Sequence, residues 1–300
     1  MNREAGHVPV MLDEVIEYLL PCPGQTVIDG TAGGGGHAGA ILSHILPDGQ
    51  LILLDRDRGA FERLKARFGR RGDVRYFHAN FCDIDQVLRQ AGCPHVDACT
   101  LDLGLSSLQL ADADRGFSFD RPGPLDMRYD REQGLTAGDV VNRWPAERLA
   151  AVLRDFGDQP FARRIARAVV EARPIEDTGR LAEIVASAVP ARWRAGQTIH
   201  PATRVFQAVR IVVNEELAAL ETFLDKVFRL LRPGGRVVIV SFHSGEDRIV
   251  KTRFREAARE GLVRLPVRKP VRPTPEEVRA NPRARSARLR VAQRLSTAGS

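Results

Sequence analysis

The stretch that decides the fold reads Thr26-Val27-Ile28-Asp29-Gly30-Thr31-Ala32-Gly33-Gly34-Gly35-Gly36-His37. A short β-rich run ends in an aspartate, passes through a glycine-rich loop and opens a helix at about Ala38. Consecutive glycines allow a tight turn and a close approach to a ligand, because no Cβ stands in the way. The amino end of the helix adds free N–H groups and partial positive charge. This strand–loop–helix context favours a nucleotide-binding loop over a flexible turn.

Further β-rich runs follow, separated by helical patterns of crossover length. They are Leu51–Asp55, Val74–Phe77 and Ala98–Asp102. This alternation is typical of βαβ units, and it predicts an α/β fold with a Rossmann-like, mainly parallel sheet. Three of the runs end in aspartate, at Asp29, Asp55 and Asp102. The carboxyl ends of such strands are where open α/β sheets bind ligands, so we expect a ligand site there.

Between about Ala111 and Pro201 the sequence has helical patterns and no strand-like run. One helix follows Pro145, a second runs from Phe161 to about Arg173, and a third from about Arg180 to Val189. The first has apolar residues at helical spacing, and prolines stop the other two. The prediction is an all-helical insert within the α/β domain.

The α/β texture then resumes. A helical stretch covers roughly Ala202–Leu231, a turn follows at Arg232–Gly235, and Arg236–Phe242 is predicted to be a strand. We therefore expect a discontinuous catalytic domain made of residues 1–110 and 202–300, interrupted by a helical insert at 111–201 that recognises the substrate.

The chain has 300 residues and a formal net charge of +7 with a pI near 9.7. No apolar run approaches the ~18 residues of a membrane span, and no signal-like stretch begins the chain, so we expect a cytoplasmic protein without membrane attachment. Much of the positive charge lies from Arg264 onward. A basic tail there would suit a nucleic acid backbone. Two alternatives are a solvated tail that aids solubility and a final strand around Leu289 and Val291.

The cysteines are Cys22, Cys82, Cys93 and Cys99. None forms a Cys-x-x-Cys pair, and no histidine cluster completes a zinc-like set. Buried, reduced thiols are expected, and no metal site is predicted.

Asp55 is placed to accept hydrogen bonds from ribose hydroxyls, which suits both NAD enzymes and methyltransferases. Two other features separate these two classes. The loop lacks the G-x-G-x-x-G spacing that favours pyrophosphate, because Ala38 stands where the third glycine is expected. Leu231–Ile239 also resembles the late turn-and-strand element of class I S-adenosylmethionine methyltransferases. These features favour S-adenosylmethionine over NAD.

The remaining alternatives are three classes of protein. They are an NAD-dependent oxidoreductase, a non-catalytic RNA-binding ribosome-assembly factor, and a small-molecule methyltransferase. A small-molecule methyltransferase would not need the basic C-terminal segment.

The loops after the third and fourth runs supply further candidates. Phe81 is placed to stack on an adenine, although by residue type it could equally belong to the core. Asp102 and Gln109 are expected at the methionine end of the cofactor or near the target. Ser106 and Ser107 are explained equally well by a helix cap.

Across nearly its whole length the sequence is similar to the bacterial small-subunit ribosomal RNA cytosine-N4 methyltransferases of family H. The matching stretches are His7–Val10, Asp29–His37, Leu101–Gln109, Arg115–Phe119, Gly123–Arg128, His200–Arg204, Ser241–Ser244 and Asn281–Ser286. The resemblance implies a class I S-adenosylmethionine methyltransferase with a helical insert. It implies as partner small-subunit ribosomal RNA or the assembled small subunit, and leaves a homodimer open. The cofactor contacts that it implies are Gly35, Gly36, His37, Asp55, Phe81, Asp102 and Gln109. We add Gly33 of the same loop as a further candidate.

Transfer of a methyl group to the amino group of cytosine requires a polar side chain near that amino group. The lone pair of that amino group is delocalised, so a hydrogen-bond acceptor must localise density and take up the proton. The candidates are Asp126, Asp102, Ser106 and His243, with Phe117, Phe119 and Arg128 as groups that hold a splayed base. The alternative for Asp126 is a salt bridge with a nearby arginine that ties the insert to the sheet.

Two positions depart from the family pattern. Gly245 stands where leucine is usual, and Pro122 stands where aspartate is usual. Both lie in loops that we assign to the RNA side, so they bear on how the target is positioned.

Overall fold

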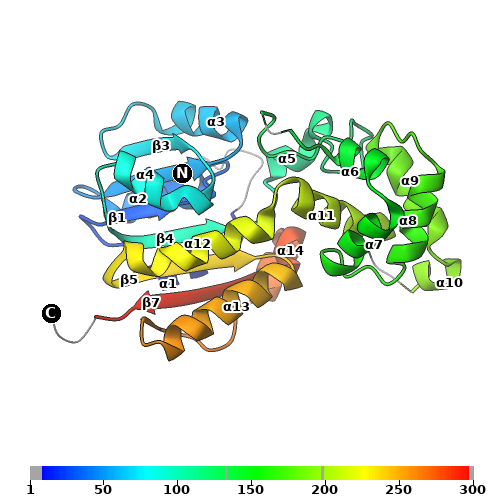
Figure 1. Ribbon diagram of the computed structural model, residues 1–300. Coiled ribbons are helices and arrows are strands. Elements are labelled where there is room, and N and C mark those ends of the chain that lie inside the picture. Colours follow the sequence, from blue (N-terminus) through cyan, green and yellow to red (C-terminus); the bar gives the residue numbers. More distant parts are fainter. Residues whose placement is uncertain (1–8, 133, 197–198, 297–300) are drawn as a thin grey trace. The chain divides into compact units, whose positions relative to one another are not determined.

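The protein is described here from a computed structural model that covers residues 9–132, 134–196 and 199–296. The chain divides into two compact units (Figure 1). Unit 1 consists of Met1–Gly104 and Leu217–Ser300, and unit 2 is Leu105–Glu216. The sequence had placed the boundaries at residues 110 and 202, so the structure assigns two further segments to the helical unit.

Unit 1 is built on a seven-stranded sheet with the strand order β3-β2-β1-β4-β5-β7-β6. The strands are β1 Thr26–Asp29, β2 Gln50–Asp55, β3 Val74–His78, β4 Val96–Asp102, β5 Leu231–Ser241, β6 Val263–Arg264 and β7 Arg288–Arg294. Neighbours among β1 to β5 pair in parallel, whereas β7 is antiparallel to β5 and β6. The predicted α/β class and its mainly parallel sheet are confirmed.

Alternate residues of the strands point to opposite faces, and helices cover both (Figure 1). One face packs on α1 Leu12–Leu19, α2 Gly36–Ile45 and α3 Arg58–Phe68. The other packs on α4 Ile84–Gln90, α12 Glu216–Leu230 and α13 Ser244–Arg259. In β1, Val27 belongs to the first core and Ile28 to the second. A strand buried on both faces explains the continuous apolar runs in the sequence.

The direction in which successive strands are added across the sheet changes at β1. From β1 the sheet grows through β2 and β3 on one side and through β4 and β5 on the other. Loops at the carboxyl ends of β1 and β4 therefore diverge, and such a switch point leaves a crevice for a ligand. Asp29 and Asp102 end these two strands.

The C-terminal region corrects the prediction of a basic tail. Residues from 263 onward form β6, α14 Pro275–Ala280, the short helix η3 Pro282–Ser286 and β7. Leu289 and Val291 of β7 are buried in the sheet. Arg288 and Arg290 both pair with Asp247 at 2.9 and 2.7 Å. The alternative of a final strand is the one observed, because β5 needs a partner to cover its open edge.

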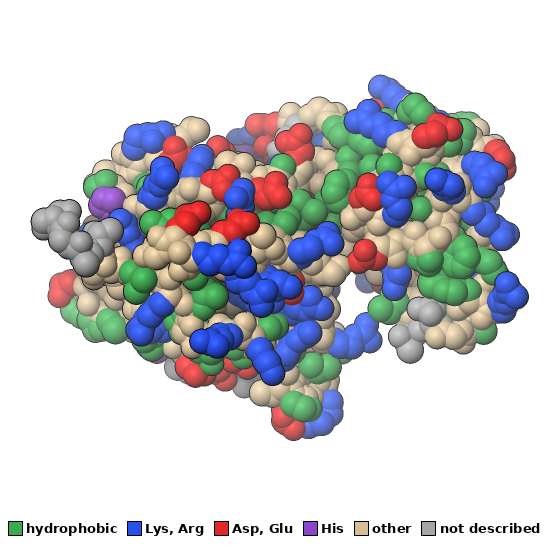
Figure 2. All heavy atoms as spheres, turned by 60° about the horizontal axis from the view of Figure 1, so that its bottom comes forward, with side chains coloured by type: hydrophobic (Ala, Val, Ile, Leu, Met, Phe, Trp, Pro, Cys, Tyr) green, Lys and Arg blue, Asp and Glu red, His purple; other side chains and the backbone are tan. Residues whose placement is uncertain are grey.

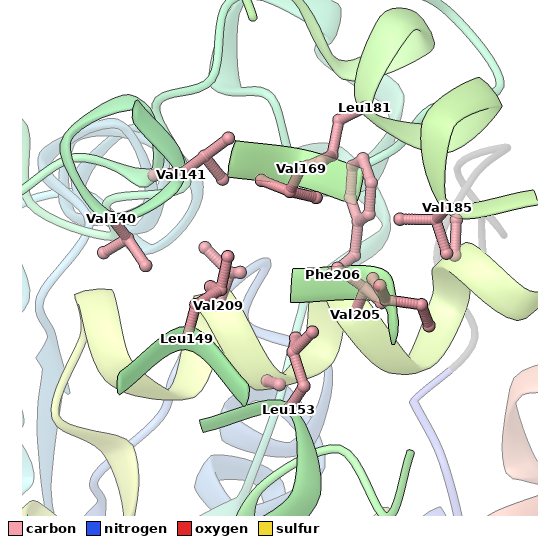
Figure 3. Close-up of a cluster of buried hydrophobic side chains, with 14 of the residues drawn as sticks. Val140, Val141, Leu149, Leu153, Val169, Leu181, Val185, Val205, Phe206 and Val209 are labelled. Atoms are coloured by element: carbon pink, nitrogen blue, oxygen red, sulfur yellow. The ribbon is translucent and has the colours of Figure 1, made fainter. Parts of the chain in front are cut away.

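Unit 2 has a core of its own. Its elements are α5 Ser107–Ala111, the short helix η2 Ala113–Arg115, α6 Ala137–Arg143, α7 Ala146–Asp155, α8 Ala162–Glu171, α9 Thr178–Ala188, α10 Ala191–Arg194 and α11 Pro201–Val213. The three helices predicted for the insert are confirmed as α7, α8 and α9. Figure 3 shows their apolar side chains pointing toward those of α11, among them Val205, Phe206 and Val209. This packing is the reason that α11 belongs to unit 2.

Two local expectations are refined. The helical stretch at 202–231 is two helices, because the chain turns at Glu215 with a left-handed φ of 51°. The turn at 232–235 lies inside β5 as a bulge, where the register with β4 shifts between Val96 and Ala98. Gly234 there has a φ of 82°, which favours glycine.

All four cysteines are free thiols. Cys99 is buried as expected, whereas Cys22 is exposed and contradicts the prediction of burial. Among the described residues, no helix combines the length and the apolar character required to cross a bilayer.

Candidate cofactor site

The glycine loop between β1 and α2 is tied to the end of β2. The N–H of Gly33 donates a 2.8 Å hydrogen bond to Oδ2 of Asp55, and the N–H of Ala32 donates to the carbonyl of Leu54. Gly33 and Gly35 have left-handed φ angles of 51° and 77°. A side chain in that conformation costs about 1–2 kcal/mol, so the loop requires glycine at both positions.

Close packing explains the next glycine. A Cβ added to Gly36 would lie 2.3 Å from Cγ of Pro9, which no real contact allows. The segment before α1 therefore packs directly on the loop. Of the first matching stretch, Pro9 has this structural role, and His7 and Val8 lie outside the described residues.

Three carboxyl groups end neighbouring strands of the sheet. Asp29, Asp55 and Asp102 are the last residues of β1, β2 and β4. Burial raises the pKa of Asp29 to about 7 and that of Asp55 to about 6. Burial, reinforced by the charge of Asp29, also raises the pKa of Asp102 well above its usual value. Negative charge is costly here, and a bound cation would offset that cost.

Asp102 is the least satisfied of the three. Its Oδ1 is buried and has no hydrogen-bond partner among the residues that the structure describes. Its Oδ2 lies 3.8 Å from Nδ1 of His37, whose Nε2 lies 3.0 Å from the carbonyl oxygen of Val10. A carbonyl only accepts, so Nε2 carries a hydrogen. An unmade buried hydrogen bond costs about 1–3 kcal/mol, so Oδ1 calls for a ligand donor.

These residues fit S-adenosylmethionine. The methionine end of that molecule carries an ammonium and a sulfonium group, and Asp102 offers a buried carboxyl oxygen without a partner. Its ribose offers two hydroxyl donors. Asp55 accepts N–H bonds from Gly33 and Asp57, but a carboxylate has about four acceptor positions, so capacity remains.

Sequence reasoning missed one residue that organises this site. The hydroxyl of Thr31 accepts a 2.6 Å hydrogen bond from the N–H of Asp102, and the N–H of Thr31 donates to Oδ1 of Asp29 at 3.1 Å. Thr31 thus joins the ends of β1 and β4. The signal was present, because Asp29-Gly30-Thr31 places a hydroxyl two residues after a buried strand.

Phe81 packs in the core of unit 1. It begins the short helix η1 Phe81–Asp83, belongs to the buried core and packs edge-on against Phe223 with ring centroids 5.8 Å apart. The core alternative that the sequence left open is the arrangement observed.

Ser106 and Gln109 bind each other's backbone. The hydroxyl of Ser106 accepts from the N–H of Gln109 at 3.2 Å, and Oε1 of Gln109 accepts from the N–H of Ser106 at 3.0 Å. This capping box begins α5 in unit 2. The helix-cap alternative for Ser106 is therefore present in the structure.

His243 begins α13 in a second capping box. Its Nδ1 accepts from the N–H of Glu246 at 3.4 Å, and Oε2 of Glu246 accepts from the N–H groups of His243 and Phe242 at 3.3 and 2.8 Å. A Cβ on Gly245 would lie 3.1 Å from Nδ1 of His243, so the leucine usual in the family would press on this ring. Because Gly245 has no side chain, nothing at this position presses on the His243 ring.

Both carboxylate oxygens of Asp126 are bound within its own loop in unit 2. Its Oδ1 accepts from Nε and from the N–H of Arg128, each at 3.0 Å, and its Oδ2 accepts from Nη2 at 2.8 Å. Met127 between them is buried with a φ of 58°. Burial raises the pKa of Asp126, but the hydrogen bonds from Arg128 outweigh it and lower the pKa overall. A salt bridge with a nearby arginine is present, but it stays within one loop of unit 2.

The aromatic candidates in unit 2 pack on neighbours. Phe117 is buried with its ring 5.5 Å from that of Tyr129, and Phe119 packs edge-on against Phe206 at 5.0 Å. Pro122 is exposed and lies against Gly179 at the start of α9, where an added Cβ would meet it at 3.0 Å.

The structure thus groups the predicted residues unevenly. One set lies together at the carboxyl ends of β1, β2 and β4 in unit 1: Gly33, Gly35, Gly36, His37, Asp55 and Asp102. His243 begins α13 directly after β5, whose Val240 pairs with Asp102, so it follows the neighbouring strand end at the same edge of the sheet. Ser106, Gln109 and Asp126 belong to unit 2.

Comparison with known proteins identifies the family. The pattern of the MraW methylase family matches residues 4–295. A relative from Solidesulfovibrio magneticus, called "Ribosomal RNA small subunit methyltransferase H", is 48% identical and covers 100% of this chain and 98% of its own. Proteins of the same name from Syntrophotalea carbinolica and Nitratidesulfovibrio vulgaris (Miyazaki F) are each 47% identical. They cover 98% and 97% of this chain, and 100% and 86% of their own.

The family pattern and these relatives span nearly the whole chain, including the glycine loop and the aspartates that end the strands. The chain therefore belongs to the MraW methylase family and is an S-adenosylmethionine-dependent methyltransferase.

Proposed function

We propose that this enzyme methylates the exocyclic N4 amino group of a cytidine in small-subunit ribosomal RNA. The observation that carries the proposal is identity of 47–48% over nearly the full length with relatives named as small-subunit ribosomal RNA methyltransferases. The choice of the cytosine amino group rests on the family resemblance of the motifs quoted above. The enzyme would act in the cytoplasm, and light scattering would show whether it is a homodimer.

The cofactor site belongs to this proposal. The backbone at Gly33, Gly35 and Gly36 would line the cofactor, because the loop turns tightly at the strand ends. The space beside Gly33 is open, whereas that beside Gly35 and Gly36 is filled by Phe68 and Pro9. Asp55 would accept hydrogen bonds from the ribose hydroxyls. Asp102, held next to His37, would face the positive charge of the methionine end. Phe81 and Gln109 remain weaker candidates, since both are engaged in local packing or capping.

Asp102 is also the best-supported candidate for handling the proton of the target. S-adenosylmethionine supplies an activated methyl group, and the protein must align that carbon with the nucleophile. Among the four polar candidates, Ser106, His243 and Asp126 each serve a cap or an ion pair. Asp102 Oδ1 and His243 Nε2 are both buried without a hydrogen-bond partner in the described part of the chain. The His243 nitrogen has the Glu246 carboxylate 3.2 Å away, and Asp102 is the one of the two that offers an acceptor oxygen. Its raised pKa makes the ionised form a stronger base.

Mass mapping of small-subunit ribosomal RNA tests the proposal. Cells with the protein should carry one cytidine that is heavier by a methyl group, and fragmentation should place the methyl on the base. Cells without the gene should lack it. A strain that expresses Asp102→Asn at wild-type level controls for an assembly role without catalysis. If no cytidine differs between the strains with and without the gene, the proposed function is wrong. A methyl group kept in the Asp102→Asn strain would instead remove Asp102 from the transfer step.

A further inference from the structure

Helix α13 presents a row of positive charge on its solvent side. Its inner side is buried through Val250, Phe254 and Ala257. The α13 stripe consists of Arg248, Lys251, Arg255 and Arg259. Their spacing of three, four and four residues places them along one side of the helix. Figure 2 shows Lys and Arg side chains gathered on the side of unit 1 where α13 lies.

The side chains of the α13 stripe make no hydrogen bond or ion pair among the described residues. The side chains of their basic neighbours do. Arg253, on the same helix, pairs with Asp225 at 2.9 Å and Glu256 at 3.5 Å. The strand arginines Arg288 and Arg290 are held by Asp247. Arg248, Arg255 and Arg259 are exposed, and Lys251 is half-buried. Uncompensated like charges repel, so a row of them is expected to have a partner outside this chain.

The dimensions suit a nucleic acid backbone. Eleven residues separate Arg248 from Arg259, a rise of about 16 Å at about 1.5 Å per residue. This length corresponds to roughly five nucleotides of one strand at about 3.4 Å each.

A lipid surface fits less well. A helix that lies on a membrane buries an apolar face in the lipid, but the apolar face of α13 is already buried in the core of unit 1.

A second basic surface, in unit 2, carries less net positive charge. A groove between α8 and α9 is lined by Arg164, Arg167 and Arg180, but Glu171 and Glu183 lie among them. Arg180 pairs with Glu183 at 3.1 Å. The positive charge of that groove is thus partly neutralised, and that of the α13 stripe is not.

We propose that the α13 stripe binds the phosphate backbone of ribosomal RNA and holds the substrate on unit 1. This inference rests on the proposed function for its partner. It adds the outer side of α13 to the C-terminal segment from Arg264 onward, in which Arg288 and Arg290 are engaged by Asp247. The stripe lies outside the cofactor site, so it contributes to substrate affinity and not to the transfer step.

The test is the salt dependence of binding to small ribosomal subunits purified from cells that lack the enzyme. The variant combines Arg248→Gln, Arg255→Gln and Arg259→Gln, because glutamine keeps helix propensity. Each lost contact to a single strand lowers the slope of log affinity against log salt by about 0.7, so we expect a loss of about two. At 0.15 M salt the affinity should fall roughly 10- to 50-fold. The melting temperature, S-adenosylmethionine affinity and kcat at saturating subunits should stay unchanged.

A control of equal charge removes three exposed charges from α3, α4 and the loop after α3 in unit 1, through Lys65→Gln, Arg70→Gln and Arg89→Gln, although Arg89 pairs with Asp85 at 3.2 Å. It should leave the slope unchanged. An unchanged slope in the α13 variant overturns the inference, and so does an equal loss in both variants, which would indicate net charge alone. A loss of binding to anionic vesicles with an unchanged RNA slope also overturns it. If the wild-type protein methylates no cytidine but the slope still falls, the proposed function fails while the RNA contact stands.

Discussion

Asp102 in unit 1 and Asp126 in unit 2 carry the same functional group in opposite surroundings. The Asp102 carboxyl has one oxygen without a partner and a pKa raised by burial. The Asp126 carboxyl has both oxygens bound by Arg128 and a lowered pKa. Both follow a turn or strand end near glycines, so the sequence offered both as candidates for the same task.

The difference indicates where a ligand is needed. A buried polar atom without a partner costs free energy, and a fold keeps such a cost where binding or catalysis requires it. A satisfied ion pair stabilises its own loop and leaves little capacity for a substrate. We therefore assign the chemistry to the strand ends of unit 1, and assign Asp126 to the shape of the 123–128 loop.

The largest expected effect comes from Asp102→Asn. Loss of a buried charged partner costs about 3–5 kcal/mol, so S-adenosylmethionine affinity and turnover should fall by about 100-fold or more. The ligand-free protein should melt at the same temperature or higher, because a costly buried carboxyl has been removed. Calorimetry and a thermal melt measure the two. Unchanged cofactor affinity in a folded variant would contradict the contrast between Asp102 and Asp126.

The next effect is that of Asp55→Ala on cofactor binding. Hydrogen bonds to a charged group are worth roughly 1.5–3 kcal/mol, which corresponds to about 10- to 100-fold in affinity. Asp55 also holds the N–H of Gly33, so part of the loss reflects the loop. Asp55→Asn is the control, because it keeps an acceptor for the ribose and for the loop. It should recover part of the affinity, and equal affinities for wild type and alanine variant would remove Asp55 from the site.

Asp126→Asn should act on stability and hardly on turnover. Replacing the carboxylate leaves Arg128 without its charged partner, at a cost of roughly 1–3 kcal/mol for a partly buried pair. Single-turnover methylation of assembled small subunits by the folded fraction should stay within about threefold of wild type. A loss of the order of 100-fold at an unchanged melting temperature would instead restore Asp126 as the proton acceptor.

The smallest effect concerns pH and Asp29. Its pKa is raised to about 7, so between about pH 4 and 7 the folded state holds a proton that the unfolded state has lost. Stability contributed by this proton is therefore lost as the pH rises toward 7. Asp29→Asn lacks this loss, so its advantage in melting temperature should grow from pH 5 to 7 and then level off. Each kcal/mol corresponds to about 2–4 °C.

The matched control is Asp48→Asn, at an exposed position before β2. It should show no growing advantage over the same pH range. A constant difference between wild type and Asp29→Asn at all pH values would mean that Asp29 is ionised in the ligand-free fold.

The position of the cofactor site was predictable from local pattern, but its internal pairing was not. Glycines at 33, 35 and 36 and aspartates at the strand ends are visible in the sequence, because strand, turn and helix each leave a short-range pattern. The hydrogen bond between Thr31 and Asp102 joins residues 71 positions apart, and no local pattern announces it. The same holds for Phe81, whose environment depends on Phe223 of another helix.

By itself the sequence determined the α/β class, the positions of the first four strands along the chain, the helical insert and the aspartates that end the strands. These follow from periodicity and from chain connection, which act over a few residues at a time. The tertiary structure decided which carboxyl lacks a partner, that α11 joins unit 2, and that the basic C-terminal segment contains a strand of the sheet. Arg288 and Arg290 look like tail residues in the sequence, but they bind Asp247, 41 and 43 positions away. Burial and charge pairing depend on neighbours that only folding brings together, so a charge becomes structural or available only once the fold has placed its partners.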